Sequence, residues 1–309
     1  MKVLITTSTF GKFESSVLDP LKEKGLEIVQ NPFGRKMTAK ETIDYYGPDI
    51  AGVIAGTEPI TKDVINRAKS LKVISRCGIG VDNIDMVAVK AKGIQVYKTL
   101  DPVVDAVAEL TLAHIFSLLR KIPLVDRNIR CGIWNKPMGN LLKGKTIGFV
   151  GLGNIAKKVV ELTGSFYLKY LAYDINHDNN FADKFSIQYV DLNSLLKNSD
   201  IISIHLPINE NTKNLINRDN LELIKPCALL INTSRGGIVD EKALYDYLSE
   251  NKIGGAALDV FENEPYKGHL KDLDNVILSS HIGSYAKEAR VAMEFMAVDN
   301  LLKGFNFGK

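Results

Sequence analysis

The feature that most constrains the fold is the alternation of short, β-branched runs with helix-like segments. The runs include "KVLITT", "IAGVIAG", "LKVISRCG", "TIGFVG", "DIISIHLP" and "ALLINTS", and segments such as "DAVAELTLAHIFSLLRKI" lie among them. Strands that alternate with helices form βαβ units, whose strands pair in parallel and are covered by helices on both faces. The chain is therefore predicted to be an α/β protein with mainly parallel sheets.

The length of the chain predicts two domains. Its 309 residues exceed what one hydrophobic core usually serves, and the strands are too many for one sheet. A division is expected around residues 98–105, where "KTLDPVVD" breaks the pattern and opens a long helix. The final segment, "SYAKEARVAMEFMAVDNLLKGF", predicts an amphipathic helix whose partner the sequence alone does not identify.

Charge and cysteine content limit the function classes. The 39 Lys and Arg nearly balance the 36 Asp and Glu, and the sequence has no long basic run. A nucleic-acid partner is therefore not expected. Cys77, Cys131 and Cys227 lack the spacing of a metal or redox site, so no metal is expected and a reducing cytoplasmic location fits best. The apolar N-terminus is too short for a signal peptide, and no apolar stretch is expected to span a membrane.

The stretch "TIGFVGLGNIAKKVV" predicts a phosphate-binding turn between a strand and a helix. Gly151 would form the tight turn, and Gly153 would let a pyrophosphate approach the backbone at the helix N-terminus. The third position of this fingerprint governs helix–strand packing and accepts alanine, so Ala156 does not exclude the site. The alternative is an ordinary strand-to-helix turn.

An acidic residue at the end of the next predicted strand supports dinucleotide binding. Asp174 lies 23 residues after Gly151 (174 − 151), close to the roughly 20 expected for a ribose-binding carboxylate. Such a carboxylate accepts ribose hydroxyls and repels a 2′-phosphate, which favours NAD over NADP. The alternative is a solvated acid at a strand end.

Three further stretches carry residues suited to chemistry. Arg235 in "NTSRGGIVDE" follows an apolar strand, where a guanidinium can bind a carboxylate. Glu262 and Glu264 lie in "ENEP", and His281 follows the strand "NVILSS". A histidine can exchange protons with a substrate hydroxyl, and a carboxylate at its other nitrogen would fix its tautomer. From spacing alone, a surface arginine and a structural histidine remain alternatives.

The order of motifs resembles the D-isomer-specific 2-hydroxyacid dehydrogenases over nearly the whole chain. The matching stretches are "RCGIGVDNID", "GLGNIA", "HLP", "NTSRGG", "ALDVFENEP" and "SSHIGS". The resemblance implies two Rossmann-like domains with the active site in the cleft between them. The substrate-binding domain would be discontinuous, residues 1–98 plus 288–309, and the inserted NAD-binding domain would be 99–287.

The resemblance also assigns roles to residues. Arg235 would bind the substrate carboxylate and polarise the 2-oxo group, His281 would donate and accept the proton, and Glu264 would orient His281. NAD would contact Gly151, Gly153, Asn154, Ile155, Asp174, His205, Pro207, Thr233, Asp259 and Gly283. The substrate would contact Arg76, Gly78, Ile79, Gly80 and Lys136. The open alternatives are a plain turn for the Gly78–Gly80 loop and a buried backbone-capping acid for Asp259.

Within the family, the chain most resembles D-3-phosphoglycerate dehydrogenases, through "SRCGIGVDNIDMVAVKAKGIQV" and "HIGSYAKEAR". Arg76 and Lys136 would then bind the substrate phosphate, which would place the protein in serine biosynthesis. The stretch "VIAGTEPIT" lacks a further arginine of that branch, and Arg35 and Lys36 either replace it or lie in a solvated loop. The chain ends soon after its last helix, so feedback by a C-terminal serine-sensing domain is not expected.

Other functions remain open at this stage. The substrate could be another 2-hydroxy acid of the glyoxylate or hydroxypyruvate type, or the protein could be a non-catalytic NAD sensor like the family's corepressors. The related formate dehydrogenases carry glutamine where this chain has Glu264, which argues against that chemistry.

The helix "DAVAELTLAHIFSLLRKI" is apolar over more than one face, and in the family this region contacts a second subunit. A homodimer through residues 100–140 is therefore predicted, with burial inside its own chain as the alternative.

Overall fold

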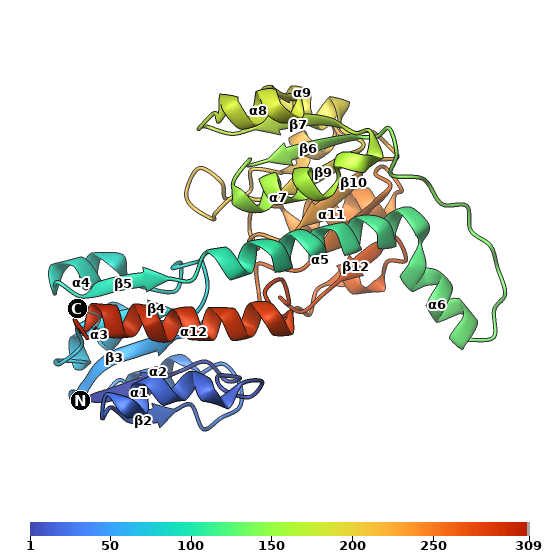
Figure 1. Ribbon diagram of the computed structural model, residues 1–309. Coiled ribbons are helices and arrows are strands. Elements are labelled where there is room, and N and C mark those ends of the chain that lie inside the picture. The colour runs from blue at the N-terminus through green and yellow to red at the C-terminus, as the bar shows by residue number, and fades with distance from the viewer. Residues whose placement is uncertain (308–309) are drawn as a thin grey trace. The chain divides into compact units, whose positions relative to one another are not determined.

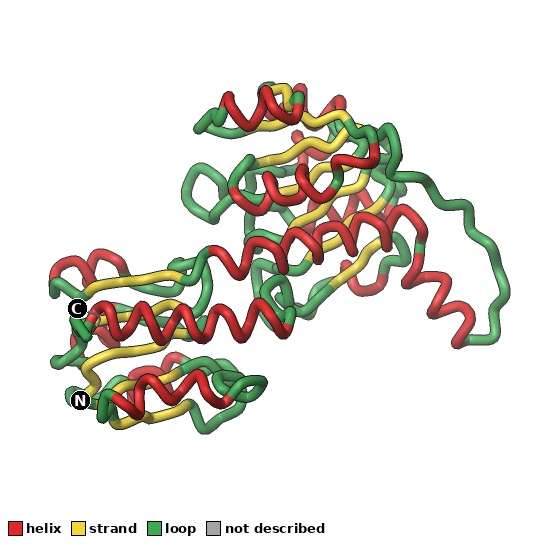
Figure 2. The backbone as a smooth tube through the Cα atoms, in the orientation of Figure 1, coloured by secondary structure: helices red, strands yellow, loops and turns green. Residues whose placement is uncertain are grey.

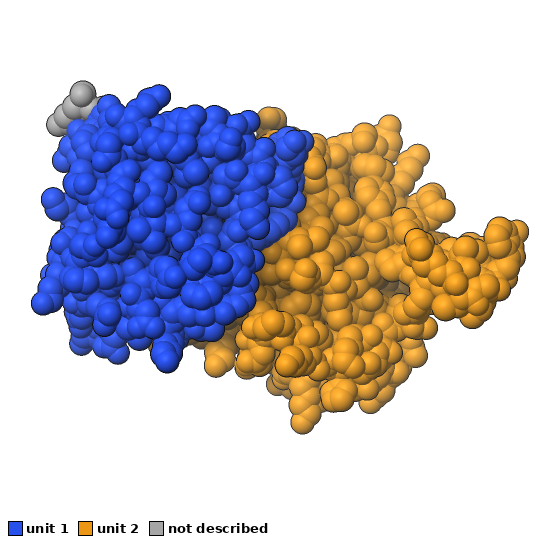
Figure 3. Space-filling model, turned by 90° about the horizontal axis from the view of Figure 1, so that it is seen from below, with its two compact units in different colours: residues 1–103, 284–309 blue, residues 104–283 orange. Residues whose placement is uncertain are grey.

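The computed structural model describes residues 1–307, which form two compact units (Figure 3). Unit 1 consists of Met1–Val103 together with the segment from Ser284 onward, and unit 2 consists of Val104–Gly283. The chain therefore leaves unit 1 once, builds unit 2 and returns to unit 1. Figure 2 shows the strands of each unit as one layer with helices on both sides, as parallel sheets require.

Unit 1 contains a five-stranded parallel sheet in the order β2-β1-β3-β4-β5. The strands are β1 (Lys2–Ile5), β2 (Glu27–Gln30), β3 (Ile50–Ala55), β4 (Val73–Arg76) and β5 (Gln95–Lys98). The helices are η1 (Ser15–Leu18), α1 (Asp19–Glu23), α2 (Ala39–Tyr45), α3 (Lys62–Arg67), α4 (Met86–Ala91) and α12 (Lys287–Gly304). Strands β3 and β4 are wholly buried, and β3 accordingly has no polar side chain. Strand β4 ends in Ser75 and Arg76, whose side chains are hydrogen-bonded.

Helix α12 packs on the sheet of unit 1, alongside β3 and β4 in Figure 1. Two glycines permit this close approach. A Cβ at Gly52 would lie 2.5 Å from the Phe305 ring, and one at Gly304 would lie 2.5 Å from a methyl group of Val73. The hydroxyl of Ser75 donates to the carbonyl of Ala297 across 2.7 Å. The partner of the C-terminal helix, which the sequence left open, is therefore the N-terminal sheet.

Unit 2 contains a seven-stranded parallel sheet in the order β12-β11-β10-β9-β6-β7-β8. The strands are β6 (Thr146–Val150), β7 (Lys169–Tyr173), β8 (Ile187–Tyr189), β9 (Ile201–Ile204), β10 (Leu229–Asn232), β11 (Gly255–Leu258) and β12 (Val276–Leu278). The helices are α6 (Ile122–Arg130), α7 (Asn154–Leu162), η2 (Gly164–Phe166), α8 (Asn179–Phe185), α9 (Leu192–Asn198), α10 (Arg218–Leu221), α11 (Glu241–Ser249) and η3 (His269–Asp272). Because β6 lies between β7 and β9, the strand order reverses there, and ligands of such sheets bind at the carboxyl ends beside this point.

Helix α5 (Asp101–Arg120) carries the chain from unit 1 into unit 2. By length and composition alone it meets the criteria for a membrane-spanning helix, although Asp105, Glu109 and His114 interrupt its apolar sequence. The physical reason for its apolar composition is packing, because Ala108, Ile115 and Leu119 belong to the hydrophobic core of unit 2. A core helix of a water-soluble domain meets the same length and composition criteria.

Candidate active site

The turn after β6 requires glycine at its first position. Gly151 has φ +94°, and its N–H donates to the carbonyl of Tyr173 across 2.8 Å. A Cβ at Gly151 would lie 2.9 Å from the carbonyl oxygen of His205 on the loop after β9. Positive φ and close backbone approach both exclude a side chain, so Gly151 fixes the contact between these two loops.

Gly153 leaves open space in front of helix α7. It is the N-cap of that helix, and a Cβ at this residue would meet no atom within 4 Å. The first N–H groups of a helix, here those of Asn154 and Ile155, have no partner inside the helix and favour an anion. Ala156 is fully buried in the core of unit 2, so the third position serves helix–strand packing as expected.

Asp174 directly follows β7 and contacts the glycine turn. Its Oδ2 accepts the N–H of Leu152 at 2.7 Å, and its Oδ1 accepts the N–H of Asn176 at 2.8 Å. An ionised carboxylate has about four acceptor sites, so two hydrogen bonds leave capacity for ribose hydroxyls. The carboxylate thus both holds the turn and lies where the fingerprint expects it.

His205 lies against the same turn. Its Nε2 is 2.8 Å from the hydroxyl of Ser203, and burial lowers the pKa of the imidazole to about 3. Within the described chain, its buried Nδ1 has no hydrogen-bond partner. Pro207 is exposed, and its carbonyl accepts the hydroxyl of Thr212 at 2.7 Å, which closes the loop after β9.

The Arg235 loop follows β10 and is shaped by its own side chains. Asn232 accepts the N–H of Ser234 at 3.1 Å and donates to the carbonyl of Arg235 at 2.9 Å. The guanidinium of Arg235 donates to the carbonyl of Ser234 at 2.7 Å. A Cβ at Gly236 would lie 2.0 Å from the backbone of Phe261, so only glycine lets this loop contact the loop after β11.

The loop after β11 brings Glu264 to His281. The Nδ1 of His281 lies 3.1 Å from Oε1 and 3.0 Å from Oε2 of Glu264, and both side chains are exposed. Oε1 of Glu264 also accepts the N–H of Phe261 at 3.2 Å, which fixes the carboxylate. His281 itself has φ +57°, a left-handed backbone that costs a non-glycine residue about 1–2 kcal/mol.

Asp259 holds the backbone on the far side of His281. The carboxylate is fully buried and accepts three donors: the N–H of Ile282 at 2.9 Å, the N–H of Gly283 at 2.8 Å and the hydroxyl of Ser279 at 2.6 Å. A Cβ at Gly283 would lie only 3.2 Å from this carboxylate. In this structure Asp259 therefore caps backbone, the alternative that the sequence left open beside a cofactor contact.

Sequence reasoning missed Thr111, His114, Ser279 and Glu241, which lie around these loops beside the expected residues Thr233 and Glu262. The buried hydroxyls of Thr233 and Thr111 lie 3.0 Å apart, and His114 contacts Ser279 at 3.1 Å. Glu241 accepts the N–H of Glu262 at 2.6 Å; burial raises the pKa of Glu241, and the charges of Glu262 and Glu264 act in the same direction. The only signal in the sequence was a histidine and a threonine inside the apolar segment "ELTLAHIFSLL".

The predicted substrate loop lies in unit 1, after β4. Gly78 has φ +145°, and its N–H donates to the hydroxyl of Thr99 at 2.7 Å. Arg76 is buried, and its guanidinium donates to the carbonyls of Gly80, at 3.0 Å, and of Cys77. Arg76 thus braces the Gly78–Gly80 loop, with Ile79 half-buried, and its phosphate role stays a prediction.

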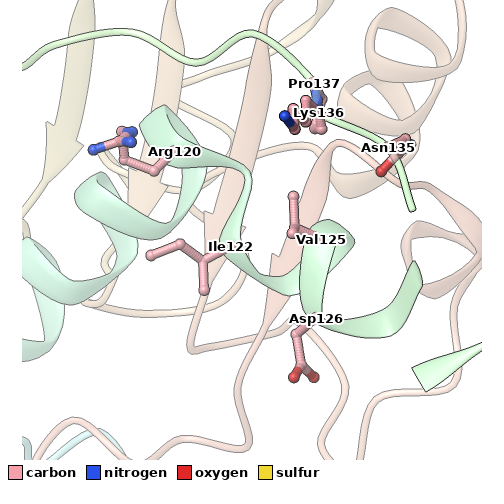
Figure 4. A pocket seen from close by; sticks show the side chains of 7 residues that line it. All are labelled: Arg120, Ile122, Val125, Asp126, Asn135, Lys136 and Pro137. Carbon is pink, nitrogen blue, oxygen red and sulfur yellow. The ribbon is translucent and has the colours of Figure 1, made fainter. Parts of the chain in front are cut away.

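Two other predicted basic contacts lie apart from these loops. Arg35 pairs with Glu41 in unit 1, Nη2 to Oε1 at 2.7 Å, and this pairing lowers the pKa of Glu41 to about 2. Lys136 is exposed in unit 2 and lines a groove with Arg120, Ile122, Val125, Asp126, Asn135 and Pro137 (Figure 4). Unit 2 thus brings together Arg235, Glu264, His281 and the cofactor candidates on loops after its strands, while Lys136 lies on the long segment after α6 (Figure 1).

Comparison with known proteins decides the family. Residues 112–283, more than half of the chain, match the model of the D-isomer specific 2-hydroxyacid dehydrogenase, NAD binding domain. The chain belongs to the D-isomer specific 2-hydroxyacid dehydrogenases. Its NAD-binding domain therefore lies within unit 2.

This dehydrogenase has relatives with different substrates in their names. It is 38% identical to a D-3-phosphoglycerate dehydrogenase of Methanocaldococcus jannaschii over 93% of this chain, but spans only 56% of that relative's length. It is 34% identical to a hydroxypyruvate reductase of Thermotoga maritima, over 94% of this chain and 98% of that one. The solved TT0316 protein of Thermus thermophilus has 33% identity and a TM-score of 0.90, over 99% of this chain and 97% of that one.

The residues of this dehydrogenase fit NAD. Gly151 has no room for a Cβ, Gly153 opens space at the N-terminus of α7, and the buried Nδ1 of His205 lacks a partner in the described chain. An anionic pyrophosphate at this helix N-terminus would meet N–H groups that the helix leaves unpaired.

The low pKa of His205 predicts a pH-dependent stability. In the unfolded chain the imidazole binds a proton below about pH 6.5, whereas in the folded protein it does so only near pH 3. The contribution of His205 to the free energy of unfolding is therefore fully present above about pH 6.5 and decreases as the pH falls below that value. Between pH 7.5 and pH 5 the loss is on the order of 2 kcal/mol. Urea unfolding of the wild type and of His205→Gln at both pH values should show a steeper loss for the wild type. Parallel losses would contradict the assignment.

The place of Asp174 predicts cofactor discrimination. Asp174→Asn keeps an acceptor for Leu152 but removes the charge, so NADH affinity should fall about tenfold while NADPH affinity falls less or rises. Fluorescence titration with both cofactors measures this. Equal weakening of both cofactors would show that Asp174 only supports the turn.

Proposed function

We propose that the protein transfers hydride between NAD and a small D-2-hydroxy acid or its 2-oxo acid. The observation that carries this proposal is the pairing of His281 Nδ1 with both carboxylate oxygens of Glu264, on loops of the NAD-binding unit. Bound NAD supplies or accepts the hydride. We also propose that the protein is water-soluble and lies in the cytoplasm. Its three cysteines are free, and Cys131 and Cys227 are exposed, which suits a compartment that keeps thiols reduced.

The side chains divide the remaining chemistry. Glu264 occupies Nδ1 of His281, so Nε2 is the atom that gives a proton to the carbonyl oxygen during reduction and takes it back during oxidation. Arg235 binds the substrate carboxylate and polarises the 2-oxo group with its planar guanidinium. The backbone amides of Ile79 and Gly80 bind the same carboxylate, whereas the N–H of Gly78 donates to the hydroxyl of Thr99.

For the substrate pair we propose D-3-phosphoglycerate and 3-phosphohydroxypyruvate. The resemblance of the Arg76 region and the M. jannaschii relative named D-3-phosphoglycerate dehydrogenase support it. One observation favours an unphosphorylated alternative such as hydroxypyruvate: the Arg76 guanidinium already donates to two carbonyls of its own loop. The T. maritima relative named hydroxypyruvate reductase supports the same alternative.

The proposed roles predict the effect of removing His281. His281→Ala should lower kcat about 10²- to 10⁴-fold because the proton donor is lost, while the Kd for NADH changes less than about twofold. NADH oxidation is followed by absorbance with 3-phosphohydroxypyruvate, hydroxypyruvate, pyruvate, glyoxylate and 2-oxoglutarate. The matched control is His269→Ala, which removes an exposed histidine of η3 and should keep wild-type turnover.

Three outcomes separate the readings. Preference for the phosphorylated acid supports the first substrate pair, and preference for another keeps the mechanism but discards that pair. Tight NADH binding by the wild type without turnover of any acid would instead favour an NAD-sensing protein. Lost NADH affinity in His281→Ala would indicate a structural histidine.

We also propose a homodimer through residues 100–140. Helix α6 and the segment after it stand away from the sheet of unit 2 (Figure 1). Large apolar side chains are exposed there: Ile122, Ile129, Ile133, Trp134, Met138 and Leu141. Apolar side chains gathered in one exposed segment mark an interaction site, and a second copy of this chain is the occupant that the family resemblance supplies.

Light scattering tests the dimer. At micromolar concentration the wild type should have about twice the chain mass of 34.2 kDa, and the double variant Ile129→Asp, Trp134→Asp should approach the monomer mass because charges would be buried at the interface. Val87→Asp, at an exposed apolar residue of α4, should leave the dimer intact. A monomeric wild type would contradict the proposal.

A further inference from the structure

A chain of hydrogen bonds runs from the interior of helix α5 to the backbone beside His281. Nε2 of His114 lies 3.1 Å from the hydroxyl of Ser279, and this hydroxyl donates to Oδ1 of Asp259 at 2.6 Å. Oδ1 and Oδ2 of Asp259 accept the N–H groups of Ile282 and Gly283. All of these residues belong to unit 2, and the first of them is a helix residue remote in sequence from His281.

The proton count fixes the direction of the first bond. A serine hydroxyl has one proton, and Ser279 gives it to the carboxylate of Asp259. The contact with His114 therefore requires His114 to donate its Nε2–H to the oxygen of Ser279. Burial lowers the pKa of His114, and the charge of Asp259 acts in the opposite direction. A neutral imidazole with its proton on Nε2 satisfies this contact.

One face of α5 contacts the loops that carry the candidate site residues. Val107, Thr111 and His114 are four and three residues apart, so they lie on one face of the helix. Val107 approaches Gly283, Thr111 bonds to Thr233, and His114 bonds to Ser279. The histidine and the threonine hydroxyl are buried and hydrogen-bonded, whereas leucine would fill such an apolar helix at no desolvation cost.

We propose that His114 is a positioning residue for His281, acting through Ser279 and Asp259. This inference rests on the proposed catalytic role of His281. The left-handed backbone of His281 is held by the two N–H groups that Asp259 accepts, and Asp259 is oriented by Ser279, whose rotamer His114 fixes. Without the His114 donor, Ser279 loses one of its two side-chain hydrogen bonds and keeps the one to Asp259, so the Ser279–Asp259 pair is held less tightly. Every group that is proposed to touch the substrate or cofactor stays in place.

The test compares two substitutions in the full-length protein. His114→Leu keeps volume but removes the donor, whereas His114→Gln places an amide N–H near the position of Nε2. His114→Leu should lower kcat for the preferred 2-oxo acid about five- to tenfold, the effect of one net hydrogen bond, with little change in the Kd for NADH. His114→Gln should stay within about twofold of the wild type.

Hydrogen exchange gives a readout that needs no turnover. The amides of Ile282 and Gly283 should exchange about five- to tenfold faster in His114→Leu than in the wild type, and at nearly the wild-type rate in His114→Gln. The amide of Ile231, in the buried strand β10, is the control and should not change. Melting temperatures of both variants report whether either has merely lost its fold.

The outcomes separate this inference from the proposed function. If His281→Ala abolishes turnover while His114→Leu matches the wild type in kcat and in exchange at residues 282 and 283, His114 is not a positioning residue. Equal losses in His114→Leu and His114→Gln would likewise overturn the proposal, because the donor would then be irrelevant. If the amides exchange as expected but His281→Ala keeps full turnover, the hydrogen-bond chain from His114 to residues 282 and 283 is supported, whereas the catalytic role of His281 is wrong.

Discussion

The buried carboxylate of Asp259 is the interaction on which the candidate site depends. It accepts three donors, two of them the backbone N–H groups that follow His281, and so holds that histidine in a left-handed backbone. A strained backbone of this kind persists only when its surroundings over-determine it. With the backbone fixed from one side, Glu264 fixes the ring from the other through Nδ1. Both anchors are local to unit 2, so His281, the proposed proton donor, is positioned by contacts within that unit.

Glycines set the distances between the loops that surround this anchor. Gly236 lets the Arg235 loop contact the backbone of Phe261, and Gly151 lets the turn after β6 contact the loop that carries His205. Neither contact tolerates a Cβ, so Gly151 fixes the distance between the loops after β6 and β9, and Gly236 fixes the distance between the loops after β10 and β11. The glycines of the family fingerprint are thus required by backbone contacts within this chain as well as by the proposed contacts with the ligand. Asp174 likewise accepts the N–H of Leu152, in addition to its proposed contact with the ribose.

The sequence predicted the α/β class and the two parallel sheets because alternating apolar runs dictate burial on both faces of a sheet. It also predicted the pairing of His281 with Glu264, through the family resemblance, and the packing role of Ala156. It could not show that Arg76 turns its guanidinium to the carbonyls of Cys77 and Gly80, because a side chain's direction depends on contacts distant in sequence. His114 escaped notice for a related reason: a lone polar residue on an apolar helix has no motif, and its partner Ser279 lies 165 residues away. Composition alone does not distinguish a core helix such as α5 from one that crosses a bilayer, and the packing of Ala108, Ile115 and Leu119 is what places α5 in the core.

The central claim is that this chain moves hydride between NAD and C2 of a D-2-hydroxy acid, with His281 supplying the proton. The most direct measurement is the analysis of the product formed from a 2-oxo acid, such as hydroxypyruvate or its 3-phosphate, with NADH that carries deuterium at both C4 positions. The account predicts a 2-hydroxy acid of D configuration that carries one non-exchangeable deuterium at C2. A product of L configuration, or a product whose C2 hydrogen comes from water, would contradict it.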